Sequence, residues 1–431
     1  MSLLRYTGAM NITFGQSVDD LPYLTADMPG IGGIIKRYNE DFVVEEVPLY
    51  PASGSGTHIY FTIEKQGMTT PAAVQQIARR LGRRPHDIGY AGMKDAHAVT
   101  RQMLSVEHID PQRVSEMEFS RIKVLTVTRH SNKLKLGHLA GNRFILKIRE
   151  SDVRAEDAVS RISAILDILA KRGVPNYFGP QRFGARGDNA LIGRAIVRND
   201  LAEAMAYILG KPGPVDHGEV HKARELFDAG DYEAAAATWP RAFGEQTKLC
   251  RVLARDRDFE KAWRAVNQTL RKLYFSAFQS DLFNQVLARR LENLDRMLVG
   301  DLAWKHRNGA CFRVEDAAAE QPRCDVFEIS PTGPLFGRRM TEALGEPGQI
   351  EAEILAGSGV TAEELERRGS DQFDGGRRPL RVPLEDPQVD ADKDERGPYL
   401  ELQFMLPAGA YATNVTREVT KRASGRDDAR E

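Results

Sequence analysis

Alternating apolar and polar residues near both ends of the chain constrain the fold most strongly. Between about Ile34 and Arg149 the stretches THIYFTIEK and RFILKIRE alternate in the way that is typical of strands with one buried face. After Gly173 helical spacing dominates, and alternation returns only in YLELQFMLP, near the end. We therefore predict a mixed-sheet domain interrupted by a helix-rich insertion, with the last strand rejoining the sheet that the chain began.

Length and composition set further limits. The 431 residues exceed what one hydrophobic core usually supports, which favours two domains. No segment is apolar enough to span a bilayer and MSLLRYTGAM lacks a leader pattern, so we expect a soluble, cytoplasmic protein. The cysteines are widely spaced and the nine histidines form no ligand cluster, so the sequence predicts no metal site.

A basic segment is concealed by the formal net charge of −1. From Arg121 to Arg149 eight residues are basic and none is acidic. Within it, RFILKIRE directs apolar residues to one side and Arg143, Lys147 and Arg149 to the other. This pattern suits a polyanionic partner such as RNA, and it also fits a solvated face on a neutral enzyme.

Two helices are predicted in the same region. TTPAAVQQIARRLG has an apolar stripe at helical spacing, with Thr70 as the expected N-cap and Pro71 in the first turn. EDAVSRISAILDILAKRG has a second stripe and is expected to end at Gly173.

The stretch AGMKDAHAVT places Lys94 and Asp95 between two predicted strands, in a tight connection at a sheet edge or cleft. Turn aspartates are common because the short carboxylate binds nearby backbone amides, so the pattern leaves a structural and a catalytic role open. Nucleotide-binding glycine loops, a GxSxG elbow and paired metal-ligand histidines are absent from the sequence. His97 and His108 have no partners that indicate acid–base chemistry.

Three other stretches combine aromatic, amide and basic residues: GHLAGNRF, NYFGPQRFG and LPAGAYATN. A flipped nucleobase needs such a set, because its ring stacks on an aromatic side chain, its edge binds an amide, and cations hold the phosphates. The same aromatic residues would also serve to fill the seam between two domains.

The chain resembles the TruD family of pseudouridine synthases. AGMKDAHAVT is similar to the signature around the catalytic aspartate of that family, and further motifs follow in the family's order over about Pro29 to Val419: MPGIGGIIKR, EDFVVEE, KLKLGHLAGNRF, GVPNYFGPQRFG, SAFQSDLFNQVLARRL, SPTGPLFGRRM and FMLPAGAYATNVTREV.

The resemblance implies an α+β fold. Its mainly antiparallel, mixed-sheet pseudouridine synthase catalytic domain would be interrupted by an inserted helix-rich α+β TruD domain. We place a lead-in at 1–31, the catalytic domain at 32–172 and 383–420, the insertion at 173–382 and a polar tail at 421–431.

The resemblance also implies an activity, namely isomerisation of uridine to pseudouridine in tRNA, with uridine 13 as the usual bacterial target. The reaction gains and loses no electrons or groups, so no cofactor is implied. The expected partner is tRNA or another structured RNA, with no membrane and no obligate protein partner. An RNA-binding or tRNA-folding module without catalysis is the alternative.

Carried over residue by residue, Asp95 matches the catalytic aspartate and Lys36 the basic residue that pairs with it. Phe42, Asn142, Phe144 and Tyr411 match positions that contact the target base and ribose. Glu46 matches a recurring acidic position to which no role is given. We expect Lys133, Lys135 and Arg143 to contact RNA phosphates. The first bond that Asp95 makes stays open among attack at C1′, attack at the uracil ring and abstraction of a ribose proton.

Two features depart from the family pattern. Tyr411 stands where the family often has Phe, and its added hydroxyl needs a partner if it is buried. Residues 199–259 are longer than in compact bacterial members, which leaves the range of RNA substrates open.

Overall fold

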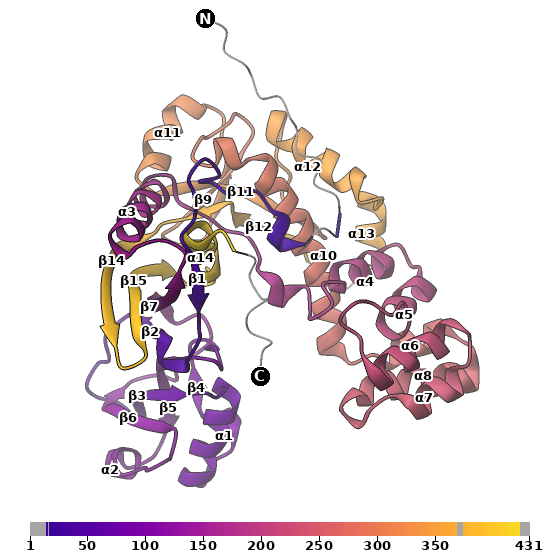
Figure 1. Cartoon of the computed structure of the whole chain (residues 1–431), viewed down its shortest axis with the longest axis horizontal. Coiled ribbons are helices and arrows are strands. Elements are labelled where there is room, and N and C mark those ends of the chain that lie inside the picture. Colours follow the sequence, from indigo (N-terminus) through magenta and orange to yellow (C-terminus); the bar gives the residue numbers. More distant parts are fainter. Residues whose placement is uncertain (1–13, 16, 369–373, 423–431) are drawn as a thin grey trace, which may run out of the picture. The chain divides into compact units, whose positions relative to one another are not determined.

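A computed structural model describes residues 14–15, 17–368 and 374–422, so residues 1–13 and 16 of the predicted lead-in and 423–431 of the predicted polar tail lie outside the described residues. The chain divides into two compact units (Figure 1). One unit comprises Thr25–Val174 and the chain from Val382 onward. The other comprises Pro175–Arg381 and the residues up to Leu24. The domain boundaries predicted from the sequence stay a prediction.

The first unit is built on a nine-stranded sheet, in which the order β14-β15-β7-β2-β5-β3-β6 is extended by β1 beside β7 and β4 beside β5. Its paired strands are antiparallel except β2 and β5, which run parallel. The strands are β1 (Gly32–Ile35), β2 (Phe42–Pro48), β3 (His58–Gln66), β4 (Gly89–Tyr90), β5 (Val99–Glu107), β6 (Ile122–His130), β7 (Leu139–Ser151), β14 (Glu385–Asp394) and β15 (Gly397–Pro407).

The predicted return of the last strand to the first part of the sheet is observed. β15 pairs with β7 along most of its length, and Phe404 lies opposite Phe144. The alternating positions of β15 are buried as expected, because Leu400, Leu402, Phe404 and Leu406 are each at most 3% exposed. The sheet therefore contains strands from both ends of the chain.

Helices cover this sheet. The apolar stripe of α1 packs with Ile59, Phe61 and Ile63 of β3 in one core. α3 ends at Gly173 as predicted and packs against β14, and α14 contacts α3 and β1. The helices are α1 (Thr70–Leu81), α2 (Pro111–Ser115), α3 (Ala155–Arg172) and α14 (Ala412–Thr420).

The predicted N-cap of α1 is wrong by one residue. Thr69, not Thr70, caps the helix, since its hydroxyl accepts a hydrogen bond from the amide of Ala72. Thr70 is buried in the first turn, where its hydroxyl donates to Gln102 and accepts from the amide of Lys94. The Thr70 hydroxyl therefore contacts the loop that contains Lys94 and does not cap the helix.

The second unit is helix-rich, with one large apolar core among α4 to α10 and a four-stranded sheet of order β10-β9-β11-β12. Its helices are α4 (Asn189–Val197), α5 (Leu201–Leu209), α6 (Gly218–Asp228), α7 (Tyr232–Thr238), α8 (Gly244–Asp256), α9 (Phe259–Ala265), α10 (Gln268–Arg289), α11 (Ala317–Asp325), α12 (Gly345–Gly357) and α13 (Ala362–Arg368). The strands of its sheet are β9 (Leu302–Lys305), β10 (Cys311–Arg313), β11 (Ile329–Leu335) and β12 (Gly376–Pro379). The two places where the chain passes from one unit to the other form a separate pair of short strands, β8 (Val174–Pro175) and β13 (Arg381–Val382).

The predicted α+β class with mainly antiparallel sheets is confirmed. Across the residues that the structure describes, no helix is both long and apolar enough to cross a membrane.

Candidate active site

Asp95 lies in the loop between β4 and β5, at the end of the parallel pair that β5 forms with β2. Its side chain is 41% exposed, and its Oδ2 lies 3.3 Å from the Nζ of Lys36. Lys36 directly follows β1 and has a left-handed backbone with φ of 58°, a conformation that is uncommon for a residue with a side chain. The structure thus joins a partly open carboxylate to a lysine 59 positions earlier.

Aromatic rings lie beside this pair. The Lys36 ammonium is 4.0 Å from the centre of the Phe42 ring, close enough for a cation–π contact. The Phe42 and Phe144 ring centres are 6.1 Å apart, and Phe404 follows at 5.5 Å from Phe144. Strand register explains the arrangement, because Phe144 lies opposite both Val44 of β2 and Phe404 of β15.

Asn142 lies opposite Glu46 of β2 and Leu406 of β15 in the same register. Residues directly opposite each other in an antiparallel pair direct their side chains to the same face, so Asn142 shares the face of Phe144 and Glu46. The amide oxygen of Asn142 is buried and has no hydrogen-bond partner within the described part of the chain. A buried acceptor of this kind is costly unless something binds it.

Tyr411 occupies the position just before α14, after β15 has ended. Its side chain is half-buried and does not cap the helix. The strand before it pairs with the part of β7 that carries Asn142 and Phe144, so the register brings the segment that follows β15 to the same region of the sheet.

Two residues that the sequence analysis left without a role hold the loop of Asp95. Lys65 of β3 is 1% exposed, and its Nζ donates to the backbone oxygens of Met68 at 2.6 Å and Asp95 at 3.0 Å. Glu46 of β2 is equally withdrawn from solvent, and its Oε2 lies 2.7 Å from the Nζ of Lys94. The contact between Oε2 and Lys94 is an ion pair and not a hydrogen bond. The other carboxylate oxygen of Glu46, Oε1, accepts a hydrogen bond from the amide of Met103.

Burial dominates the electrostatics of Lys65. Removal from water lowers the pKa of the Lys65 ammonium to about 8; the charge of Asp95 acts in the opposite direction, and the charge of Lys94 adds to the lowering. The alternation in THIYFTIEK is the sequence pattern that could have indicated the burial of Lys65, because this residue lies on the same face as the core residues Ile59, Phe61 and Ile63.

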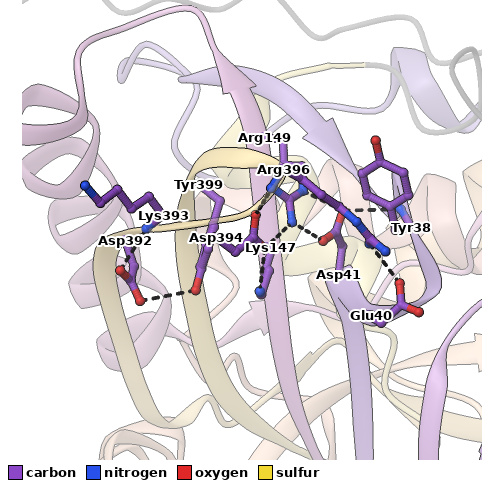
Figure 2. A network of polar contacts seen from close by, with 10 residues as sticks. All are labelled: Tyr38, Glu40, Asp41, Lys147, Arg149, Asp392, Lys393, Asp394, Arg396 and Tyr399. Carbon is purple, nitrogen blue, oxygen red and sulfur yellow. Dashed lines mark hydrogen bonds and ion pairs between the residues drawn. The ribbon is translucent and has the colours of Figure 1, made fainter.

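A second network holds the segment that carries Lys36 and Phe42 (Figure 2). The Arg149 guanidinium forms two hydrogen bonds to Asp41, of 2.9 and 2.7 Å, and two to Asp394, of 3.0 and 2.7 Å. These bonds raise the pKa of Arg149, and the bonds from Arg149 and then Lys147 lower the pKa of Asp394. The turn between β14 and β15 is thereby bound to the residues just before β2.

Arg396, which lies beyond Asp394, extends the network. It stacks on the Tyr38 ring at 4.0 Å and donates to Glu40 at 2.9 Å. The amide of Tyr38 donates to Asp41, so both arginines bind the same short segment.

The expectation that one side of RFILKIRE offers its cations to a partner is wrong for Arg149. Arg149 is only 5% exposed and binds two carboxylates, and Lys147 is 2.9 Å from Asp394. Lys135 is exposed, Lys133 donates to the backbone of His86 and Arg143 faces Asp386 at 3.9 Å. The last three positions stay predicted phosphate contacts.

Metal-binding clusters of three or more His, Cys, Asp or Glu side chains do not occur among the described residues. The candidate site instead combines a carboxylate, a cation, aromatic rings and an amide side chain. Groups of these kinds are suited to contacts with a planar polar ring, such as a nucleobase.

Comparison with known proteins identifies the family. The family model of tRNA pseudouridine synthase D (TruD) matches residues 20–419. Proteins named tRNA pseudouridine synthase D from Geobacter metallireducens and Geobacter sulfurreducens are 50% and 47% identical, each over 94% of this chain and 98% and 97% of their own lengths. A crystal structure of a Methanosarcina mazei protein assigned as TruD superposes with a TM-score of 0.82 at 29% identity, covering 93% of this chain and 96% of that one.

The chain therefore belongs to the TruD family, whose members isomerise uridine to pseudouridine. The resemblance deduced from the motifs is confirmed.

Proposed function

We propose that this protein converts uridine 13 of tRNA to pseudouridine and that the Asp95 carboxylate is its catalytic group. The observation that carries the proposal is the partly exposed Asp95 side chain, held 3.3 Å from Lys36 beside the rings of Phe42 and Phe144. The names of the Geobacter relatives support tRNA as the substrate.

The reaction balances within one nucleotide. The C1′–N1 bond breaks, the uracil turns, C5 bonds to C1′, and the proton that C5 loses is matched by one that N1 gains. Attack at C1′, attack at the ring and abstraction of a ribose proton all require an ionised carboxylate. The Lys36 ammonium lies 3.3 Å from Oδ2 of Asp95.

Recognition of the base is proposed for the residues around the pair. The half-buried Asn142 side chain is proposed to bind the edge of uracil through its amide group. Phe42, Phe144 and Tyr411 offer rings against which a flipped base or its ribose can pack. Lys133, Lys135 and Arg143 are proposed to bind phosphates, and Lys135 is the most open of them.

The first prediction tests Asp95. The purified protein should form pseudouridine in a tRNA transcript with uridine at position 13, and not in the same transcript with cytidine there. Asp95→Asn should lower turnover by at least about 10³-fold while tRNA binding persists, because the amide cannot act as a carboxylate. Turnover is measured by nucleoside chromatography and binding by filter retention.

Asp167→Asn is the matched control, since Asp167 is exposed on α3 and its charge change is the same. Wild-type turnover in Asp95→Asn would refute the catalytic assignment. Binding of tRNA without any conversion by the unmodified protein would instead favour an RNA-folding module.

A further inference from the structure

The loop that carries Asp95 is fixed by side chains. From Gly92 to His97 no residue takes part in a backbone–backbone hydrogen bond, a statement that holds for this fully described loop. Backbone bonds lie only at its two ends, where the oxygen of Ala91 accepts from Gly137 and the oxygen of Ala98 accepts from Gly67. A turn held in this way depends on its side-chain anchors for the position of every atom in it.

Lys65 anchors one side of the loop. It occupies a core-facing position of β3, and it reaches the Asp95 backbone oxygen at 3.0 Å. Among the described residues it has two backbone oxygens as partners and no ion pair, an arrangement that burial makes unfavourable for an ammonium group. A structural turn needs no such group, since an apolar side chain would fill the same core position.

Lys94 anchors the other side. Its side chain is 4% exposed and reaches Glu46, which is 2% exposed, and its amide donates to the Thr70 hydroxyl at 2.9 Å. Thr70 is itself fixed by a 2.9 Å bond to Gln102 of β5. The residue before Asp95 is thus bound through both its backbone and its side chain.

These contacts bind the backbone on both sides of Asp95 and leave the carboxylate for Lys36. On the basis of the proposed function, we propose that Lys65 and the buried Glu46–Lys94 pair are positioning residues for the reaction: they fix the backbone of Asp95 so that its carboxylate meets the target nucleotide in one orientation. Misplacement of a reacting group by about 1 Å lowers rates by about 100-fold, so small movements of this loop matter.

The test separates rate from stability. Lys65→Met keeps a side chain of similar length and removes both hydrogen bonds of the Lys65 ammonium. This variant should lower kcat by about 10- to 100-fold and leave the Kd for tRNA unchanged. Because an apolar group replaces a buried cation, stability should change little or rise. Ile63→Val, in the same strand and fully buried, should lower stability with kcat unchanged.

Glu46→Gln is the second variant and keeps the proposal testable if Lys65→Met does not fold. It leaves the Lys94 ammonium buried without a counter-charge, so kcat should fall by about tenfold. Adding Lys94→Met should restore part of that loss, since no unpaired charge is then buried.

Wild-type kcat in Lys65→Met or in Glu46→Gln overturns the positioning role. A kcat loss in Ile63→Val that matches its stability loss overturns it as well, because general loosening would then explain the effect. If Asp95→Asn is inactive and these variants are fully active, only this inference fails. If Asp95→Asn turns over normally, the proposed role of Asp95 and this inference both fail.

Discussion

The two partners of the Lys36–Asp95 pair are held in different ways. Asp95 is held from the core, by Lys65, Lys94 and Glu46, whose side chains are almost fully withdrawn from solvent. Lys36 belongs to a segment held by arginine networks that begin in the interior, at Arg149, and reach the surface.

The two sets of contacts also differ in how far apart their residues lie in the sequence. The anchors of Asp95 come from β2, β3 and the loop itself, all within the first quarter of the chain. Those of the Lys36 segment depend on the turn between β14 and β15, with Asp394 lying 245 positions from Arg149. Solvent and salt screen an exposed ion pair and hardly affect a buried one. We therefore expect the Asp95 side to set alignment and the Lys36 side to respond to conditions.

The largest effect in this comparison is expected for Arg149→Met. It leaves the Asp41 carboxylate buried without its guanidinium partner, so the free energy of unfolding should fall by about 3–5 kcal/mol. Urea denaturation measures the change. Adding Asp41→Asn should recover part of the loss, because the uncompensated charge is then removed.

Arg143→Met is the control on the same strand, where the side chain is 41% exposed and 3.9 Å from its acidic neighbour. It should change the free energy of unfolding by at most about 1 kcal/mol. An equal loss in both variants would show that burial does not distinguish the arginines of β7.

Particular residues show how much of the structure could be predicted from the sequence alone. Alternation in YLELQFMLP predicted the buried face of β15, and the spacing of EDAVSRISAILDILAKRG predicted the end of α3 at Gly173. The burial of Lys65 and Glu46 was not predicted, although Lys65 continues the alternation of Ile59, Phe61 and Ile63 along β3. The Arg149–Asp394 contact was not predicted either, because nothing local in either strand specifies a partner so far along the chain. Likewise, local spacing did not distinguish the cap Thr69 from the buried Thr70.

The next effect is a pH dependence with opposite signs for rate and stability. Lys65 has a pKa lowered to about 8 and faces Asp95 and Lys94, which in turn contact Lys36 and Glu46. As pH rises through about 8, loss of the Lys65 proton removes a charge beside Asp95, and kcat should fall by up to about tenfold. An unfolded lysine keeps its proton to about pH 10.4, so the unfolded state binds more protons between these values and the contribution to stability rises with pH.

Rate and unfolding profiles from pH 6 to 10 check this prediction, with Lys65→Met as the reference. That variant should lack the alkaline decrease in kcat and the corresponding rise in stability. An identical alkaline limb in both proteins would assign the ionisation to another group.

The smallest effect is expected at the exposed end of the Lys36 support. Arg396→Ala removes the stack on Tyr38 at 4.0 Å and the bond to Glu40, in which both side chains are nearly half exposed. The free energy of unfolding should fall slightly at low salt, and part of that difference should disappear at about 1 M salt as the ion pair is screened. Arg396→Lys retains the charge and loses the planar stack, so it separates the two contributions. Urea denaturation at both salt concentrations distinguishes the ion pair from the ring contact. A loss of stability that salt does not change would assign the effect to the ring contact. The contacts that hold the Lys36 segment would then be less sensitive to salt than their exposure suggests.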